Sequence, residues 1–254
     1  MLLSLAVLYG ALAVLSLGIA MLVVRYDLYD REPWFMLVIA TAAGAALMWC
    51  AGRVQAGLID WLDDHPVLMS NLFYASLAAL TEELAKFSVV LIICFAFRRH
   101  FNDPMDGIVY GSFAGLGAAI EESIWVMGWP DQIQFLPAQE PIRLMGHLVM
   151  GGIGCAALGF RPLGGRSARF FVPVGLLAAI ALHALWDVVA FASHDEFRAT
   201  QRISAIHSFF GVLLMLAGMI MFRFFVSIAS ESSRRLFART ATRAEASANG
   251  PNHQ

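Results

Sequence analysis

The residues of this sequence that are best placed to do chemistry are charged side chains inside apolar stretches. In ALTEELAKFSVV, residues 79–90, Glu82, Glu83 and Lys86 are the only Asp, Glu, Lys, Arg or His residues of the segment 67–97. Lys86 is also the only lysine of the chain. Two adjacent carboxylates in a low-dielectric site cannot both ionise cheaply, so one is expected to be neutral while the other stays charged against Lys86. Such an arrangement is capable of acid–base catalysis.

Three further apolar stretches contain ionisable residues. They are Glu121 and Glu122 in GLGAAIEESIW, His147 in LMGHLVMGG, and His183 with Asp187 in LHALWDVV. Glu82 and Lys86 are four residues apart, and so are His183 and Asp187, which places each pair on one helix face. The carboxylate of Asp187 is therefore predicted to orient the His183 imidazole. Each pattern alone also fits a structural ion pair or hydrogen bond between helices, so the functional interpretation depends on their combination.

The elements that must position these residues are membrane helices. The chain has 254 residues, 59% hydrophobic and 14% charged, with a mean hydropathy of +0.69, which is too apolar for a soluble domain. Its basic residues are scattered between apolar segments, which excludes a nucleic-acid groove. Seven stretches approach the roughly 20 residues needed to cross a bilayer: 3–24, 35–52, 67–97, 107–129, 143–160, 170–192 and 204–228. The sequence predicts an all-α, polytopic membrane protein with a bundle of about seven transmembrane helices.

The domain organisation follows from the same hydropathy pattern. Residues 1–230 are predicted to form a single transmembrane domain, with the candidate catalytic residues in the part 67–192. The tail 231–254 is polar, rich in small residues and arginine, and is expected to be disordered in the cytoplasm.

The arginines predict the orientation of the helices in the cell membrane, because cytoplasmic loops are enriched in basic residues. Eleven arginines lie in the first, third and fifth loops and the tail: Arg25, Arg31, Arg98, Arg99, Arg161, Arg166, Arg169, Arg234, Arg235, Arg239 and Arg243. Only four lie on the other side: Arg53, Arg143, Arg198 and Arg202. This distribution predicts an N-terminus outside and a C-terminus in the cytoplasm. At about 1.5 Å per residue, the ionisable residues of all four stretches then lie between the outer interface and the bilayer centre. They are predicted to share one cavity that opens outward.

Taken together, the four elements resemble the PrsW-type intramembrane proteases, which are related to the CAAX-prenyl endopeptidases. EELAK resembles the EExxK motif, and residues 103–123 (DPMDGIVYGSFAGLGAAIEES) resemble an aspartate-rich turn followed by DGIVYG and GLGFAxxEN. GHLVMGGIGCAALGF is similar to the family's helix of a histidine and small residues, and LHALWD matches its HxxxD element. The lysine three residues after the second glutamate is typical of PrsW rather than of the EExxxR motif. The elements follow in family order over residues 80–190.

The resemblance implies a role for each candidate residue. Glu82 and Glu83 would be the water-activating carboxylates, and Glu122 would be the glutamate of the FxxxE element. His183 and Asp187 would form the closing HxxxD pair. Lys86 and His147 would be supporting residues. Two positions depart from the family pattern, because Ala118 replaces the phenylalanine of FxxxE and Ser123 replaces the asparagine after the glutamate. These changes affect the expected shape of the cavity and choice of substrate more than the chemistry.

By this resemblance, the protein is an intramembrane endopeptidase. Its substrate would be a single-pass membrane protein, such as an anti-sigma factor, cut near the outer face in a site-1-type cleavage. Two chemistries stay open. One is a metal-free glutamic protease, preferred because the sequence has no HExxH motif. The other is a metalloprotease with Zn²⁺ on Glu122, His147 and His183.

Two other classes of protein use the same residue types. A proton- or ion-coupled transporter also contains intramembrane Glu, Asp and His, but transporters commonly have internal repeats and no second copy of EELAK or HALWD occurs here. The other class is a catalytically inert membrane scaffold. The oligomeric state, and which of Glu82 and Glu83 takes the proton, do not follow from the sequence.

Overall fold

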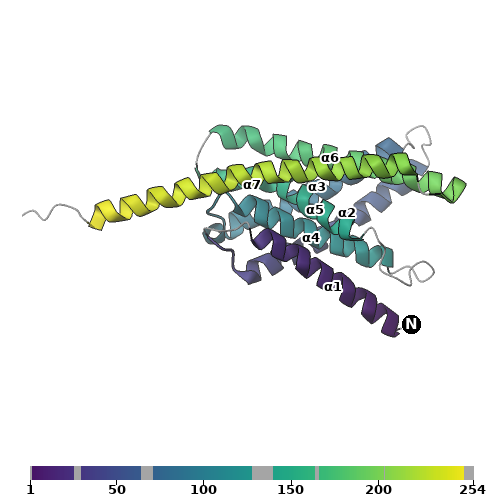
Figure 1. Cartoon of the computed structure of the whole chain (residues 1–254), viewed down its shortest axis with the longest axis horizontal. Helices are drawn as coiled ribbons and strands as arrows, with labels where there is room; N and C mark the ends of the chain where they lie inside the picture. Colours follow the sequence, from purple (N-terminus) through teal and green to yellow (C-terminus); the bar gives the residue numbers. More distant parts are fainter. Residues whose placement is uncertain are drawn as a thin grey trace, which may run out of the picture.

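The protein is a bundle of α-helices. A computed structural model describes residues 2–25, 30–63, 71–127, 140–163, 166–202 and 204–248, and contains no strand in these ranges. The helices are α1 Leu2–Val24, α2 Trp34–Asp63, α3 Asn71–Ala96, α4 Asp106–Met127, α5 Glu140–Cys155, α6 Arg166–Thr200 and α7 Ala205–Ala248, with short 3₁₀ helices η2 Arg98–His100 and η3 Ala156–Leu163. The long α7 crosses the whole bundle and extends beyond one end of it (Figure 1). The all-helical fold predicted from the sequence is therefore confirmed.

Each apolar stretch contains one α-helix in its described part, and the fifth also contains part of the 3₁₀ helix η3. In the described part of the chain, four segments are long and apolar enough to cross a membrane: Trp34–Trp61, Glu140–Phe160, Val172–Thr200 and Ala205–Ala238. These segments make the chain a multi-pass membrane protein. Residues 67–70 and 128–129 of two expected spans lie outside the described residues.

The helices differ in length from the apolar stretches because polar turns extend them. α2 continues eleven residues beyond 52, and α6 extends past both ends of 170–192. The fifth stretch, 143–160, is divided at Ala156, where α5 passes into the 3₁₀ helix η3. Gly159 and Pro162 follow this point, and both residue types disfavour an α-helix interior.

The polar stretch after residue 230, for which composition predicts disorder, is helical as far as Ala248. Arg234 Nε and Arg235 Nε each lie 2.8 Å from the carboxylate of Glu231, and ion pairs at these spacings stabilise a helix. The buried hydroxyl of Ser233 donates a hydrogen bond to the carboxylate of Asp103, in the turn before α4. Burial raises the pKa of Asp103 above its usual range. Residues 249–254 lie outside the described residues.

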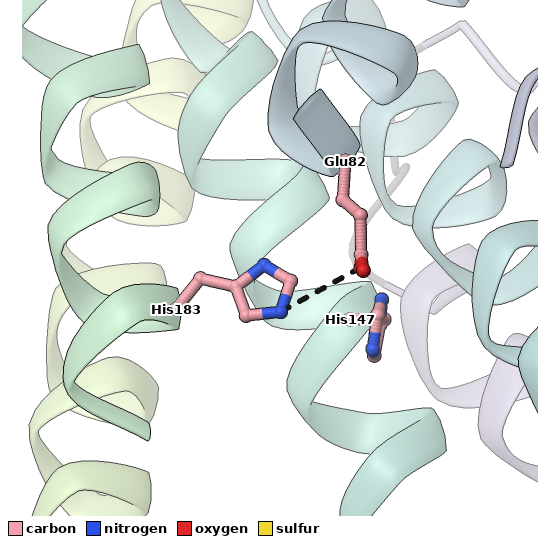
Figure 2. Close-up of side chains that lie close together, drawn as sticks. All are labelled: Glu82, His147 and His183. Atoms are coloured by element: carbon pink, nitrogen blue, oxygen red, sulfur yellow. Dashed lines mark ion pairs between the residues drawn. The ribbon is translucent and has the colours of Figure 1, made fainter. Parts of the chain in front are cut away.

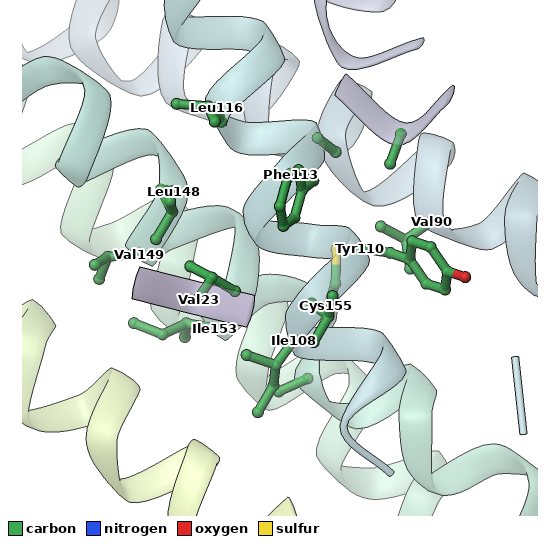
Figure 3. Packing of buried hydrophobic residues seen from close by; sticks show 14 of the residues in the cluster. Val23, Val90, Ile108, Tyr110, Phe113, Leu116, Leu148, Val149, Ile153 and Cys155 are labelled. Atoms are coloured by element: carbon green, nitrogen blue, oxygen red, sulfur yellow. The ribbon is translucent and has the colours of Figure 1, made fainter. Parts of the chain in front are cut away.

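The hydrophobic core surrounds α4. Ile108, Tyr110, Phe113 and Leu116 of this helix are buried among side chains of α1, α3 and α5, including Val23, Val90, Leu148 and Ile153 (Figure 3).

Two glycines allow α4 to contact its neighbours through the backbone. A Cβ atom on Gly115 would lie 2.1 Å from the carbonyl oxygen of His147, and one on Gly117 would lie 1.9 Å from that of Thr41. Glycine is required for so close an approach, which sets the α5 turn of His147 against α4.

We expect Gly115→Ala to separate α4 from α5, because its Cβ has no room beside the His147 carbonyl. Overpacking of this kind costs about 1–3 kcal/mol or more. The measurement is thermal unfolding of the purified protein in detergent. Gly146→Ala is the matched control, since the nearest atom to its Cβ would be Met150 Cε at 3.7 Å. Identical unfolding temperatures for the two variants would contradict the close contact.

Candidate active site

The ionisable residues of the apolar stretches come together from four helices. α3 contributes Glu82, Glu83 and Lys86, α4 contributes Glu122, α5 contributes His147, and α6 contributes His183 and Asp187. Glu82, His147 and His183 are at most 8% exposed. Their side chains point toward one another from three different helices (Figure 2). A buried cluster of carboxylates and imidazoles has the composition expected of a hydrolytic or metal-binding site.

Glu83 is the carboxylate that the protein holds in place. Its Oε1 accepts a hydrogen bond from Lys86 Nζ at 2.6 Å and lies 2.7 Å from Nδ1 of His183. Glu83 and Lys86 are each only 1% exposed, so each needs the other as a partner. The four-residue spacing places Lys86 on one helix face with Glu82, but the sequence left open which glutamate is its partner. The pair is formed with Glu83, because a spacing of three also brings two side chains together on a helix.

Glu82 has a carboxylate oxygen that accepts no hydrogen bond from the described residues. Its Oε2 has no hydrogen-bond partner among the described residues and lies 3.6 Å from Nε2 of His183. Its Oε1 lies 3.4 Å from the side-chain amide of Gln55 on α2. A buried carboxylate oxygen without a partner is uncommon in proteins, which makes Glu82 Oε2 a candidate ligand for an ion or a water molecule.

His183 is oriented by Glu83 more closely than by Asp187. The Glu83 carboxylate is 2.7 Å from Nδ1, whereas Asp187 Oδ2 is 3.6 Å from Nε2. The expectation that Asp187 holds the imidazole therefore needs correction. The i,i+4 spacing does put Asp187 on the same face, but Glu83 of the neighbouring helix reaches the ring at hydrogen-bond distance.

His147 has a carboxylate on one nitrogen only. Its Nε2 lies 3.1 Å from Glu122 Oε2, and its Nδ1 has no hydrogen-bond partner among the described residues. The ring packs edge-to-face against His183, with centroids 5.2 Å apart. Of the two adjacent glutamates of α4, Glu122 is thus the one that contacts another member of the cluster.

Two further residues, Glu140 and Arg143, complete this side of the cluster. The carboxylate of Glu140, which is fully buried, lies 3.0 Å from Arg143 Nη1 and accepts a hydrogen bond from the Ser123 hydroxyl. Arg143 Nε lies 3.4 Å from Glu122 Oε1, so it connects the two glutamates. Glu140, Arg143 and His147 are spaced by three and four residues, so they share one face of α5. This spacing is the sequence pattern that could have indicated Glu140 and Arg143.

Three side chains of the cluster fit a metal ion. One donor atom each from Glu82, His147 and His183 lies within 4.8 Å of the other two. Two imidazoles and a carboxylate are a ligand set that catalytic zinc sites use, with a further position open to water. The unpartnered Glu82 Oε2 and His147 Nδ1 agree with this set. The set expected from the sequence had Glu122 in place of Glu82. Glu122 contacts the other nitrogen of His147 instead, as carboxylates behind metal-binding histidines do.

Residues 32–222 match the family described as "PrsW family intramembrane metalloprotease". The chain belongs to this family. It is also 28% identical over 177 residues to "Protease PrsW" of Bacillus subtilis (strain 168), a match that covers 68% of this chain and 78% of that protein. No solved structure matches the chain significantly. The family match over residues 32–222 spans all the residues of the cluster, so the resemblance to the PrsW-type proteases is confirmed. Membership of this family supports a protease rather than a transporter or a scaffold.

Proposed function

We propose that the protein is a zinc-dependent intramembrane endopeptidase, which hydrolyses a peptide bond of a membrane-anchored protein. The observation that carries this proposal is the buried group of Glu82, His147 and His183, whose donor atoms lie within 4.8 Å of one another in a member of a family of intramembrane metalloproteases. Zn²⁺ bound to these three residues would supply a Lewis acid for the scissile carbonyl and activate water at neutral pH.

The surrounding carboxylates fix the two imidazoles for this task. Glu83, anchored by Lys86, lies 2.7 Å from Nδ1 of His183, and we assign the ring proton to this nitrogen, which leaves the lone pair on Nε2. Glu122 Oε2 lies 3.1 Å from Nε2 of His147, so we assign the proton of this ring to Nε2 and the lone pair to Nδ1. With these assignments, both histidines have the tautomer that a ligand to a cation needs.

We assign proton transfer to Asp187. Peptide hydrolysis needs a group that takes a proton from the attacking water and returns it to the leaving amine. The side chain of Asp187 is 17% exposed, and its Oδ2 lies 3.6 Å from His183 Nε2, so it borders the cluster without being enclosed by it. Glu83 is unsuited to this role, because its Oε1 is already occupied by Lys86 and His183.

The substrate that we assign is a single-pass membrane protein, such as an anti-sigma factor, cleaved near the outer face of the cell membrane. The distribution of arginines supports an outer N-terminus with seven crossings, in which α3 begins and α6 ends at the outer face. In that orientation Glu82, His147 and His183 lie between the bilayer centre and the outer interface, which supports cleavage in the outer part of a substrate's membrane segment.

Chelation tests the proposal. Protein in proteoliposomes is incubated with a panel of single-pass membrane substrates before and after removal of metal, and bound zinc is measured by mass spectrometry. We expect about one zinc ion per chain, loss of both zinc and cleavage on chelation or in His147→Ala, and recovery of the chelated wild type by added Zn²⁺.

Two outcomes would contradict it. Cleavage that continues at full rate in zinc-depleted protein would overturn the zinc assignment and leave Glu82, with its free Oε2, as the base of metal-free hydrolysis. Absence of cleavage across the panel by zinc-loaded protein would count against an endopeptidase and favour an ion-coupled transporter.

A further inference from the structure

A groove of about 340 Å³ lies between α2, α3 and α6. Its lining comprises Gln55 and Ile59 of α2, Tyr74, Leu77 and Ala78 of α3, and Phe191 of α6. The volume is in the range of about 300–1,000 Å³ that is typical of ligand pockets. The surface is apolar apart from the amide of Gln55 and the hydroxyl of Tyr74, so its chemistry suits hydrophobic side chains.

The groove follows the same helix faces as the candidate active site. On α3, Tyr74, Ala78 and Glu82 succeed one another at spacings of four residues. On α6, the same spacing connects Asp187 to Phe191. Because a helical turn rises about 5.4 Å, Ala78 and Phe191 lie one turn away from Glu82 and Asp187 respectively.

The turn from Glu82 to Ala78 and the turn from Asp187 to Phe191 lead to the same end of the bundle. α3 and α6 run in opposite directions, as the hydrogen bond from Asn71 Nδ2 to Asp195 Oδ2 at 2.9 Å indicates, since it joins the start of α3 to the last turns of α6. Moving backward along α3 and forward along α6 therefore leads toward the same end of the bundle. The groove lies beside the Glu82 site, toward the end where α3 begins.

Gln55 connects the groove to the site. Its side-chain amide donates a hydrogen bond to Thr81 Oγ1 at 2.7 Å and lies 3.4 Å from Glu82 Oε1. A half-buried amide in an otherwise apolar membrane groove is costly unless its polar atoms have partners. A peptide about to be cleaved exposes backbone N–H and C=O groups that also need partners in hydrocarbon. An amide side chain meets this need.

We propose that this groove binds the apolar residues of the substrate's membrane segment beside the scissile bond, in extended form, with Gln55 hydrogen-bonded to the substrate backbone. The inference depends on the proposed function, because it names where the substrate of that reaction lies. Ile59, Leu77 and Phe191 bind the apolar side chains. The NH2 group of Gln55 already contacts Thr81 and Glu82, so its carbonyl oxygen is the atom that accepts a hydrogen bond from a substrate N–H. A lipid acyl chain fits the apolar surface equally but offers no such donor, so the polar residue favours the peptide.

Photo-cross-linking in proteoliposomes tests the site independently of turnover. p-Benzoylphenylalanine is placed at Leu77 or at Leu80 in the Glu82→Gln variant, and the single-pass substrates of the same panel are added. Leu80 is on the same helix and 45% exposed, but it does not line the groove. We expect substrate cross-links from position 77, mapped to the apolar residues next to the cleavage site, and only background from position 80. Equal labelling from both positions, or cross-links to lipid alone, would overturn the proposal.

A steric variant gives a second readout. Leu77→Trp fills the groove and is expected to raise KM for the membrane substrate about tenfold, with a smaller effect on kcat, whereas Leu80→Trp stays at the wild-type values. Cleavage by the wild type with no effect at position 77 in either experiment contradicts the groove and leaves the protease intact. Cross-linking from position 77 without any cleavage by the wild type contradicts the proposed hydrolysis and leaves the binding site intact.

Discussion

Glu82→Gln is expected to abolish cleavage, lowering kcat/KM on the order of 10³-fold or more, while the helix bundle stays folded. Glutamine keeps the size of the side chain and the contact with Gln55, but it removes the negative charge from the oxygen that faces His183. It also removes the only carboxylate of the three-residue donor set, so bound zinc is expected to fall together with activity. The measurements are initial cleavage rates in proteoliposomes, zinc content and the unfolding temperature.

Glu121→Gln is the matched control for this substitution. It also removes one carboxylate from a pair of adjacent glutamates within a membrane helix, but Glu122 is the member of that pair that contacts His147. We expect the rate and zinc content of Glu121→Gln to equal those of the wild type. A Glu82→Gln protein that retains the wild-type rate would contradict the assignment of Glu82 in both the zinc-dependent and the metal-free chemistry.

The helices were predictable because crossing a bilayer requires a long apolar run, and that requirement is visible residue by residue. The convergence of Glu82, His147 and His183 was predictable for a related reason. Charged residues inside membrane helices are costly, so charges at matching depths on successive helices indicate a shared interior. Depth along each helix follows from counting residues, and needs no knowledge of how the helices pack.

The partner of each ionisable group was not predictable in the same way. Spacings of three and four residues both bring side chains together, so Lys86 was equally compatible with Glu82 and Glu83. The choice depends on His183, which approaches Glu83 from α6 and adds a second contact to the same oxygen. The His183 imidazole likewise had one visible partner in the sequence, Asp187, because a contact from another helix leaves no local spacing pattern.

Polar residues at the ends of the apolar runs were missed for another reason. Hydropathy marks where an apolar run stops, but a helix continues as long as its polar turns find partners. Gln55 lies beyond the predicted stretch 35–52, yet α2 continues and brings its amide to Glu82. Arg143 stands at the first residue of another predicted stretch, and it contacts Glu122 from the first turns of α5. Both residues border the cluster, so part of the candidate site lies at the ends of the predicted spans.

Lys86→Met is expected to destabilise the protein by about 3–5 kcal/mol, because it leaves Glu83 as a buried charge without its cation. Glu83 is 1% exposed, and Lys86 Nζ lies 2.6 Å from its Oε1, so water does not replace the lost partner. Methionine keeps most of the apolar length of the lysine side chain, which limits the change to the charge. The measurement is thermal and denaturant unfolding in detergent micelles.

The double variant Glu83→Gln/Lys86→Met separates stability from catalysis. Removing both members of a buried ion pair is often close to neutral, so the double variant is expected to unfold near the wild-type temperature. Its cleavage rate is expected to stay about 10–100-fold below the wild type, because Nδ1 of His183 has lost the carboxylate that orients the ring. A double variant as unstable as Lys86→Met would show that the lysine stabilises the bundle by packing alone. A double variant with the wild-type rate would show that Glu83 does not position His183.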